Sequence, residues 1–451
     1  MNLAAGKPAA GETVEVEIEA IGARGDGIAR AGGVAIFVPL TAPGDRLTVK
    51  VGTKRGDGLA GEAVAWQVLS PERQKPPCPV FGRCGGCAWQ HLSPDLYARI
   101  KRDLLIEALA RQGLQAGTAF PVDPTRISPP GDRRRVRFAG ERTGRGVTLG
   151  LHVRAGHDLV NLEQCPVTAP VIVALLEPAR DVAATLDVLR PGRRPAAFQL
   201  AVTLTDAGPD LTWTLPVAPS LADRERLAAF SAAQNIARIS WRKPASDETG
   251  GTELVLQRAP AQLRFGTAMA DLPPDGFLQA GAAGERALQE LVLSAVDGAP
   301  AGPVADLFSG CGTFSLPLAA TRAVHAADGD AAAIAALDRA ARHGGLSRIK
   351  AERRDLMRRP LHVQELKRFA AVVFDPPRAG ALAQAQELAR STVPTVVAVS
   401  CDSATLARDM KILVDGGYAI ERITPIDQFL WSPRIEAVAV LQRPGKARRR
   451  G

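Results

Sequence analysis

The chain has 451 residues, of which 46% are hydrophobic and 23% are charged. That length exceeds what a single hydrophobic core normally serves, so we expect a globular protein of two or three domains. No apolar run approaches the roughly 18 residues that a membrane span needs, and residues 1–12 lack the apolar stretch of a secretory signal. We therefore expect a cytoplasmic protein that has no membrane partner.

The formal net charge is +9, and arginines gather in the runs Arg133–Arg137 and Arg448–Arg450. Guanidinium forks match phosphate oxygens, so these clusters favour a nucleic-acid partner. Two plainer explanations stay open. A GC-rich genome enriches a chain in arginine and alanine, and the terminal run is also what a basic tail looks like.

Residues 12–70 have the pattern of a small β-barrel. Val14, Val16 and Ile18 alternate with glutamates, and glycine-containing turns flank the strand candidates Val34–Val38 and Leu47–Val51. Five short strands in about 60 residues favour an OB-like barrel, a shape that often binds nucleic acid. A barrel without a role in RNA binding is the alternative.

The middle of the chain predicts a mixed α+β domain over residues 73–270. A proline-rich linker at 71–79 is followed by Leu96–Gln112, whose apolar residues recur at helical spacing. From Arg133 to about Ala270 the pattern is strand-like, with one helical stretch near Leu221–Asn235. The helix near 94–112 is the part of this region that can pack on the domain that follows.

From Gly284 onward short apolar strands alternate with helices, which is the pattern of a parallel α/β sheet. The expected strands are Val304–Leu307, Ala323–Ala327, Ala371–Phe374 and Thr395–Ser400, with a closing pair near Tyr418–Pro425 and Ala437–Gln442. We expect a Rossmann-like domain over residues 271–451.

A glycine loop and three acidic strand ends predict a nucleotide-like cofactor at this sheet. Gly310 and Gly312 follow the strand that ends at Leu307 and allow the backbone to approach a ligand closely. Asp328 ends the next strand, where a carboxylate accepts hydrogen bonds from ribose hydroxyls, and Asp355 is placed to face an adenine. An unrelated glycine turn is the alternative.

Two further strand ends carry reactive groups. Asp375 begins an Asp-Pro-Pro run; in enzymes that methylate exocyclic nitrogens an aromatic residue usually follows such a run, but here Arg378 does. Cys401 follows the next strand, just before an expected helix, and helix N-termini lower thiol pKa values. We interpret Cys401 as a nucleophile, with a buried structural cysteine as the alternative, and Cys311 as a residue that only fills space.

Four of the six cysteines, Cys78, Cys84, Cys87 and Cys165, have the spacing of a ligand set, and glycines beside them allow their sulfurs to converge. Disulfides are disfavoured in the cytoplasm, so a metal site is the better interpretation. Four thiolates suit either zinc or a [4Fe–4S] cluster. The Cys-x5-Cys-x2-Cys spacing is unusual for a zinc ribbon, so we favour the cluster, while a coincidental set of buried thiols stays possible.

Together these motifs resemble the RNA uracil-C5 methyltransferase family whose members carry an N-terminal TRAM domain. The barrel resembles TRAM, the segment Cys78–Leu92 resembles the family's cluster segment with Cys165 as its distal ligand, and Ser400–Asp409 resembles the nucleophile segment. The resemblance implies that the fold is an α/β Rossmann-like methyltransferase domain with an OB-like TRAM barrel at residues 1–72 and a central α+β domain that carries an iron-sulfur cluster.

The resemblance also implies the cofactor and the catalytic pair. S-adenosylmethionine contacts fall on positions that match Gln279, Phe308, Thr313, Asp328 and Asp375. Cys401 would add to C6 of uracil, and Glu436, which matches the family's base, would remove the C5 proton. An RNA substrate is implied, with 23S rRNA favoured over tRNA because tRNA enzymes of the family typically lack both the TRAM domain and the cluster. We expect a monomer.

The chain departs from the family pattern in four places. Gly281 replaces an asparagine of the cofactor motif, Asp402 stands where asparagine is usual, and Trp431 and Arg434 occupy the positions of two histidines before Glu436. Three rival interpretations are a cytosine-C5 methyltransferase, a radical S-adenosylmethionine enzyme and a non-catalytic RNA-binding protein. The first needs a cysteine after Asp375-Pro, the second needs Cys-x3-Cys-x2-Cys, and the intact Cys401 and Glu436 argue against the third.

Overall fold

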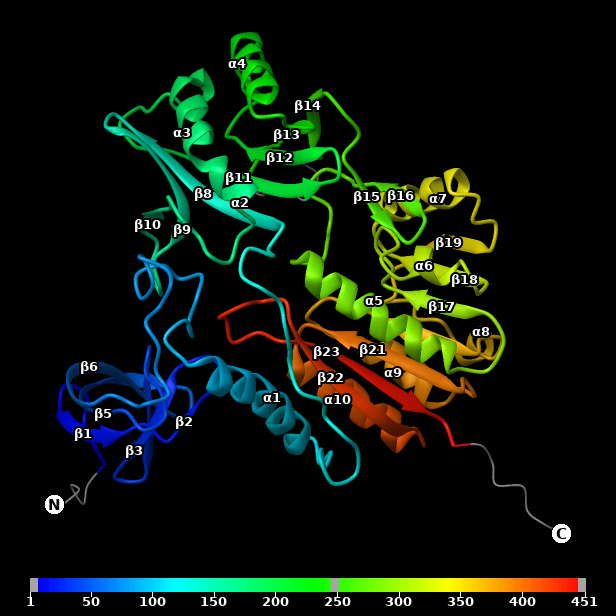
Figure 1. The fold of residues 1–451 in the computed structure, drawn as a ribbon, viewed down its shortest axis with the longest axis horizontal. Coiled ribbons are helices and arrows are strands. Elements are labelled where there is room, and N and C mark those ends of the chain that lie inside the picture. The colour runs from blue at the N-terminus through cyan, green and yellow to red at the C-terminus, as the bar shows by residue number, and fades with distance from the viewer. Residues whose placement is uncertain (1–6, 245–250, 445–451) are drawn as a thin grey trace.

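The computed structural model describes residues 7–244 and 251–444, whose strands form four sheets. A small barrel lies at one end, a mixed sheet covered by helices lies above it, and an α/β unit lies beside both (Figure 1). The basic run Arg448–Arg450 lies outside the described residues. Among the helices of the described ranges, none combines the length and apolarity that a membrane crossing requires.

The N-terminal sheet has six strands in the order β1-β5-β6-β4-β3-β2. Their bounds are Thr13–Glu17 (β1), Ala20–Ile21 (β2), Gly27–Ala31 (β3), Val34–Val38 (β4), Arg46–Arg55 (β5) and Gly58–Val68 (β6). The expected alternation is confirmed, because Val16, Ile36, Leu47 and Val49 form the barrel core. The count of five strands is wrong: β6 is exposed along most of its length, so it lacks the buried alternation that marks a strand.

The second sheet has seven strands in the order β10-β9-β8-β11-β12-β13-β14. Their bounds are Arg135–Thr143 (β8), Gly146–His152 (β9), Leu159–Asn161 (β10), Ala196–Thr205 (β11), Gly208–Thr214 (β12), Arg238–Arg242 (β13) and Glu253–Gln257 (β14). A short hairpin follows, made of β15 (Gln262–Phe265) and β16 (Ala268–Asp271), and β16 packs against α7 (Ala331–His343) of the next sheet.

Helices cover one face of this second sheet, and the prediction of a single helical stretch there is wrong. The expected helix is present as α4 (Leu221–Ala233), but α2 (Pro170–Ala174) and α3 (Leu176–Thr185) precede it. Pro170 stands at the start of α2, where a missing N–H costs nothing. Buried Leu176, Ala179, Val182 and Ala183 recur at spacings of three and four along α3, as on the inner face of a helix.

The third large sheet has eight strands in the order β19-β18-β17-β20-β21-β23-β22-β7. Their bounds are Arg126–Ile127 (β7), Val304–Leu307 (β17), Val324–Asp328 (β18), Ile349–Arg353 (β19), Ala371–Phe374 (β20), Thr395–Ser400 (β21), Ala419–Asp427 (β22) and Glu436–Gln442 (β23). The strands from β19 to β21 are parallel, and β23 and β22 add to them as an antiparallel pair. The Rossmann-like parallel sheet is thus confirmed, with β7 as an edge strand that the sequence did not predict.

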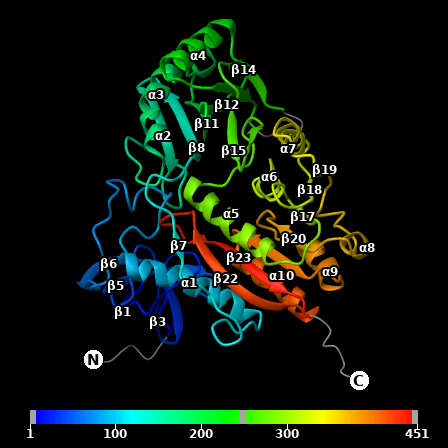
Figure 2. The ribbon, with the colours of Figure 1, turned by 45° about the vertical axis from the view of Figure 1, so that its right-hand side comes forward.

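Helices pack on both faces of this sheet (Figures 1 and 2). They are α5 (Ala282–Asp297), α6 (Ser315–Leu318), α7, α8 (Val363–Leu366), α9 (Leu382–Ala389) and α10 (Ser403–Asp415). The helix α1 (Pro94–Arg111) lies between the barrel and this unit and packs against α10, so its Leu105 and Leu109 share a core with β20 and β21.

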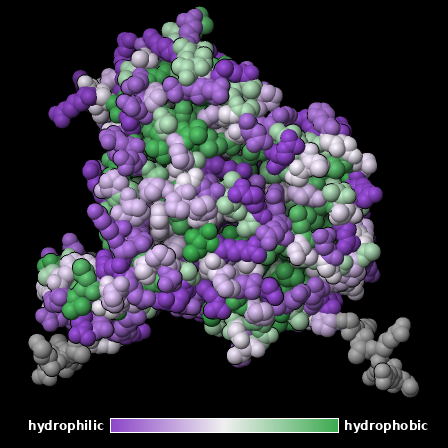
Figure 3. Space-filling view, in the orientation of Figure 1, coloured by the Kyte–Doolittle hydropathy of each residue, from purple (hydrophilic) through white to green (hydrophobic). Residues whose placement is uncertain are grey.

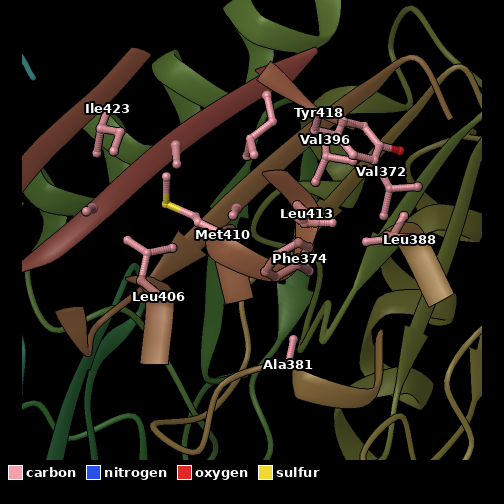
Figure 4. Packing of buried hydrophobic residues seen from close by; sticks show 14 of the residues in the cluster. Val372, Phe374, Ala381, Leu388, Val396, Leu406, Met410, Leu413, Tyr418 and Ile423 are labelled. Carbon is pink, nitrogen blue, oxygen red and sulfur yellow. The ribbon is translucent and has the colours of Figure 1, made fainter. Parts of the chain in front are cut away.

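The largest core lies between the sheet and α9 and α10. Figure 4 shows Val372, Phe374 and Val396 of the sheet facing Met410 and Leu413 of α10. On the face in Figure 3, hydrophilic residues cover much of the surface and hydrophobic residues form scattered patches. The fold therefore fixes the ends of β17, β20 and β21 on a rigid base, and these are the strand ends that carry the predicted site.

Candidate active site

The glycine loop leaves β17 through left-handed backbone. Phe308 has φ 61°, and Gly310 and Gly312 have φ 53° and 101°. A bulky residue rarely adopts such a φ unless the surrounding structure holds it there, and such positions cluster at functional sites. A Cβ on Gly312 would lie 2.8 Å from Leu316, whereas a Cβ on Gly310 would meet no atom within 4 Å. Gly310 therefore has open space beside it in which a ligand can approach the backbone.

The carboxylate of Asp328, at the end of β18, is bound to this loop. Its Oδ2 accepts a hydrogen bond from Gly310 N at 2.9 Å, and its Oδ1 accepts one from Asp330 N at 2.8 Å. Thr313 lies partly buried one turn further along the loop. Asp355, beyond the end of β19, is exposed and accepts a local hydrogen bond from Met357 N at 3.1 Å. Each Asp328 carboxylate oxygen retains a second lone pair for a ligand hydroxyl, whereas Asp355 Oδ1 accepts a second backbone hydrogen bond, from Arg358 N at 3.3 Å.

A chain of side-chain amides joins the next two acidic residues. Gln279 Nε2 donates to Asp375 Oδ2 at 2.8 Å, and Gln428 Nε2 donates both to Gln279 Oε1 and to Glu436 Oε2, each at 2.7 Å. Ala280 N donates to Gln428 Oε1 at 3.0 Å, so the orientation of the Gln428 amide is fixed at both ends. The structure thereby links the predicted cofactor residues Gln279 and Asp375 to Glu436.

Gln428 is the functional residue that the sequence did not predict. It begins the segment that joins β22 to β23 and lies eight positions before Glu436. It belongs to none of the motifs found in the sequence. Its amide donates a hydrogen bond to Gln279 only because the fold brings together residues that are 149 positions apart. Its nearness to the base segment was the one available signal, and that signal does not reveal where a side chain points.

Strand register places Cys401 opposite Glu436. Ser400 of β21 pairs with Ala437 of the antiparallel β23, so the next position on each strand brings Cys401 and Glu436 to the same sheet end. Asp375 follows β20, the neighbour of β21 on its other side. A thiol and two carboxyl groups from three adjacent strands therefore meet at one edge.

Burial makes all three groups reluctant to ionise. Burial, with a smaller contribution from the charge of Asp375, raises the pKa of Glu436 well above its ordinary range, although its bond to Gln428 opposes the rise. Burial likewise raises the pKa of Asp375 to about 7. Glu436 is 2% exposed, and within the described ranges its Oε1 has no hydrogen-bond partner. Such an oxygen is positioned to accept a proton from a bound molecule.

The Cys401 thiol is not activated in the way that its position before a helix predicts. Burial first, and then the charges of Glu436 and Asp375, raise its pKa to about 11, although Arg378 opposes the rise. Two N–H groups at the start of α10, those of Ala404 and Thr405, already donate hydrogen bonds to the side chain of Asp402, which caps the helix. The expected lowering of the thiol pKa by the helix N-terminus is therefore wrong.

A cleft of about 650 Å³ opens onto Cys401 between the barrel, α1 and the segment before Glu436. Arginines from five separate segments line it: Arg24, Arg111, Arg154, Arg378 and Arg434. Arg24, Arg111, Arg378 and Arg434 are exposed. The cleft is therefore a positively charged space that leads to the thiol.

The four cysteines of the predicted cluster line a second cavity, of about 430 Å³. They are Cys78, Cys84, Cys87 and Cys165, and each is partly exposed. Burial, followed at smaller scale by the other three thiols, raises the pKa of Cys87 to about 12. Within the described ranges no group of three or more His, Cys, Asp or Glu side chains is arranged to hold a single metal ion. The structure thus brings the four thiols to one cavity, but not into a site for one ion.

Two family models match the chain. The tRNA (Uracil-5-)-methyltransferase model matches residues 269–444, and the TRAM domain model matches residues 9–64. A protein of Brucella melitensis described as an uncharacterized RNA methyltransferase is 44% identical, over 96% of this chain and 98% of its own length. The 23S rRNA (uracil(1939)-C(5))-methyltransferase RlmD of Halomonas elongata is 33% identical, over 96% of this chain and 90% of its own length.

A solved structure shares the overall fold. The tRNA (uracil-54, C5)-methyltransferase of Pyrococcus abyssi, in complex with S-adenosyl-L-homocysteine, matches 95% of this chain and 99% of its own with a TM-score of 0.69, at 23% identity. The Rossmann-like parallel sheet with an N-terminal TRAM domain is a methyltransferase fold. The chain belongs to the RNA uracil-C5 methyltransferase family. Its reaction is the S-adenosylmethionine-dependent methylation of uracil C5 in RNA.

Proposed function

We propose that the chain methylates a uridine of 23S rRNA through a covalent bond between Cys401 Sγ and uracil C6, with Glu436 as the base. The observation that carries the mechanism is the strand register that sets Cys401 opposite a buried Glu436 whose Oε1 has no partner in the described ranges. A nucleophile and a base at one sheet edge are what C5 methylation of uracil requires, because C5 alone is too weak a nucleophile to attack a sulfonium.

The steps follow from these two side chains. The Cys401 thiol loses its proton to solvent and the thiolate adds to C6, so the electron pair of the C5=C6 bond makes the ring an enolate with an electron-rich C5. C5 then takes the methyl group, which S-adenosylmethionine supplies when it is bound. Glu436 accepts the remaining C5 proton through Oε1, the C6–S bond breaks, and the thiolate is regenerated. The raised pKa of Glu436 makes its ionised form a stronger base than an exposed carboxylate.

The residues around the glycine loop fit the methyl donor. Gly310 and Gly312 would allow the close approach, the Asp328 carboxylate would accept hydrogen bonds from the ribose hydroxyls, and Asp355 would contact the adenine. Phe308 and Thr313 flank the loop, and Gln279 and Asp375, which a hydrogen bond joins, would contact the cofactor on the side of Cys401. The amide chain to Glu436 would thus connect cofactor binding with the base.

The substrate class rests on the arginine-lined cleft and on the relatives. Five arginines around one cleft suit the phosphates of RNA, and a flipped uracil has to reach Cys401 from that cleft. The relative from Halomonas elongata favours 23S rRNA. The tRNA enzyme of Pyrococcus abyssi shares the fold over 95% of this chain, and the family model that matches residues 269–444 is described as tRNA (Uracil-5-)-methyltransferase. A tRNA uridine is therefore the second candidate.

We also propose a [4Fe–4S] cluster at the cavity lined by the four cysteines, within a central region at residues 73–270. Zinc bound by four thiolates has Zn–S bonds of about 2.3 Å and would draw the sulfurs close together. The four cysteines line one cavity, and their Cys-x5-Cys-x2-Cys spacing is unusual for a zinc ribbon, so we favour the cluster over zinc. The cluster would tie Cys165 to the segment that carries Cys78, Cys84 and Cys87. Methyl transfer requires no electron from it.

Mass spectrometry of RNA tests the substrate. The protein is incubated with S-adenosylmethionine and either 23S rRNA or bulk tRNA from a strain that lacks its gene, and nucleosides are analysed for 5-methyluridine. We expect 5-methyluridine in 23S rRNA with the wild type and none with Cys401→Ala. The modification in tRNA alone would favour the second candidate, and its absence from both RNAs would contradict uridine methylation.

A further inference from the structure

The segment 428–435, between β22 and β23, carries the base side of the site and is held by a buried charged network. Three side chains make up this network: Lys101 and Tyr97 of α1 and Asp427 at the end of β22. Lys101 and Asp427 are 0% exposed, and Tyr97 is 3% exposed. None of them belongs to a motif that pointed to the chemistry, and none contacts the thiol or the cofactor loop in the described ranges.

Each member of the network contacts the backbone of the segment. Lys101 Nζ donates to Asp427 Oδ1 at 2.7 Å and also to the carbonyl of Arg434, two residues before Glu436. Tyr97 Oη donates to Asp427 Oδ2 and accepts a hydrogen bond from Trp431 N at 2.7 Å. Phe429 N donates to Asp427 Oδ1 at 3.0 Å. The network therefore binds the backbone of the segment near its start, at its middle and near its end.

Trp431, at the middle of the segment, lies in left-handed backbone with φ 58°. A bulky residue keeps such a conformation only where surrounding contacts determine it. Its N–H is held by Tyr97, and its carbonyl accepts hydrogen bonds from Ala88 N at 2.8 Å and Trp89 N at 3.1 Å. The path of the chain from Gln428 to Glu436 is thus imposed from α1 and from the cysteine segment.

The buried ion pair of Lys101 and Asp427 is not explained by its contribution to the stability of the fold. A buried lysine and aspartate lose their hydration, and replacing a buried ion pair by neutral side chains of similar volume is often neutral for stability. What this pair provides is a fixed position for the backbone on both sides of the base. Small displacements of a catalytic group cost large factors in rate.

We propose that Lys101 and Asp427 are positioning residues that hold Glu436 in place for removal of the C5 proton, with Tyr97 as their third member. They act through the backbone of residues 429–434 and touch neither substrate nor cofactor. This inference rests on the proposed function, since it assigns a role to residues that support the proposed base.

The test uses the double variant Lys101→Met/Asp427→Asn, which removes both charges at nearly constant volume. The matched control is Arg238→Met/Asp210→Asn, a buried pair held at 2.6 and 2.8 Å in the second large sheet, away from the segment. The measured quantities are the melting temperature, the burst of methyl transfer to RNA, and the rate at which the covalent protein–RNA complex resolves.

We expect each single variant to lower the melting temperature, because it strands a buried charge, and the double variant to recover most of that loss. The double variant should still transfer methyl groups in the first turnover, while its covalent complex resolves about ten- to a hundredfold more slowly than in the wild type. The control should resolve the complex at the wild-type rate.

A folded double variant that resolves the complex at the wild-type rate would overturn the inference. If the double variant does not fold, Tyr97→Phe decides, because it removes only the hydroxyl that joins Asp427 to Trp431 N. Slow resolution in Tyr97→Phe supports the inference, and wild-type resolution overturns it. A wild-type protein that forms no Cys401-linked RNA contradicts the proposed function instead, so the two failures are distinguishable.

Discussion

Cys401 lies in an environment that favours the protonated thiol. Burial and two neighbouring carboxyl groups raise the thiol pKa. The positive charge of the Arg378 guanidinium opposes this rise. A thiol that stays protonated in the free enzyme is also protected from oxidation, because the thiolate is the reactive form.

The raised pKa predicts slow alkylation of Cys401 in the absence of RNA. With a pKa of about 11, the thiolate fraction grows as pH rises, so the rate with iodoacetamide should increase about tenfold per unit between about pH 8 and pH 10. Mass spectrometry of the peptide that contains Cys401 gives the rate, and the urea-denatured protein is the control, with faster alkylation at about pH 8. A rate in the folded protein that levels off below about pH 9 would contradict the assignment.

Asp328 is predicted to bind the cofactor ribose. Asp328→Ala removes charge-assisted hydrogen bonds of roughly 1.5–3 kcal/mol, so affinity for S-adenosylmethionine should fall about ten- to a hundredfold. The variant also frees Gly310 N, which loosens the glycine loop. Calorimetry measures the affinity. Asp338→Ala is the matched control, since it removes an equal charge from the exposed side of α7, and equal affinity in the two variants would mean that Asp328 has been misassigned.

The sequence predicted which residues form the site better than it predicted their contacts and pKa values. Cys401 and Glu436 were identified because their segments resemble family motifs, and register places them opposite each other. Gln428 was missed because an amide signals nothing until the fold shows what it touches. The direction of the Cys401 pKa shift was wrong because a helix start is visible in a sequence, whereas burial and the cap by Asp402 are not.

The strands of the Rossmann-like sheet illustrate which elements are predictable. β17, β20 and β21 begin and end where the sequence predicts, because strands covered on both faces are short continuous apolar runs. The helices α2 and α3 were missed because Val171 and Val173 resemble a strand, and only Pro170 and the spacing of later residues indicate a helix. β7 was missed because its two residues gain their partner from β22, about three hundred positions away.

At the start of α5 the chain departs from the family pattern, and a residue from another segment caps the helix. Gly281 stands where the family has asparagine, and the helix gets its cap from Asp132, whose carboxylate accepts Ala283 N at 2.9 and 3.1 Å. A Cβ on Gly281 would lie 2.0 Å from Asp132 Oδ2, so an asparagine at this position would displace the Asp132 carboxylate from its capping position.

Because an asparagine at position 281 would displace the Asp132 carboxylate, a substitution of Asp132 should compensate for it. Gly281→Asn should cost about 1–3 kcal/mol through the clash, and Asp132→Gly about 1 kcal/mol through the lost cap. The double variant should recover most of the stability, because the introduced asparagine can then cap the helix. Urea unfolding followed by circular dichroism gives the three free energies. Simple additivity of the two losses would contradict this account of the α5 start.

For the whole molecule, the sequence predicted the parts but not their arrangement. The barrel, the mixed sheet and the Rossmann-like sheet each show local periodicity, which is why they were predictable. The arginine-lined cleft was not predictable, because its lining comes from the barrel, α1, the second sheet and two loops of the third. Only packing brings Arg24 and Arg434 to the same cleft.

The proposed cluster predicts the metal content of the intact protein. Anaerobically purified enzyme should be brown and carry about four irons per chain, and Cys84→Ser or Cys165→Ser should bleach it. Cys311→Ser is the matched control, since Cys311 is buried in the glycine loop and does not line the cavity of the four cysteines. Iron analysis and the visible absorption spectrum provide the measurement. Stoichiometric zinc without iron would overturn the cluster.

The central claim, a covalent route with Cys401 as nucleophile and Glu436 as base, is tested most directly by trapping the complex. Glu436→Gln keeps an oxygen for Gln428 but cannot accept the C5 proton, so the methylated adduct should accumulate and survive denaturing gel electrophoresis. This band should require S-adenosylmethionine, persist with Cys311→Ala and disappear with Cys401→Ala. Wild-type turnover by Glu436→Gln, or an equal band in the Cys401→Ala background, would contradict it.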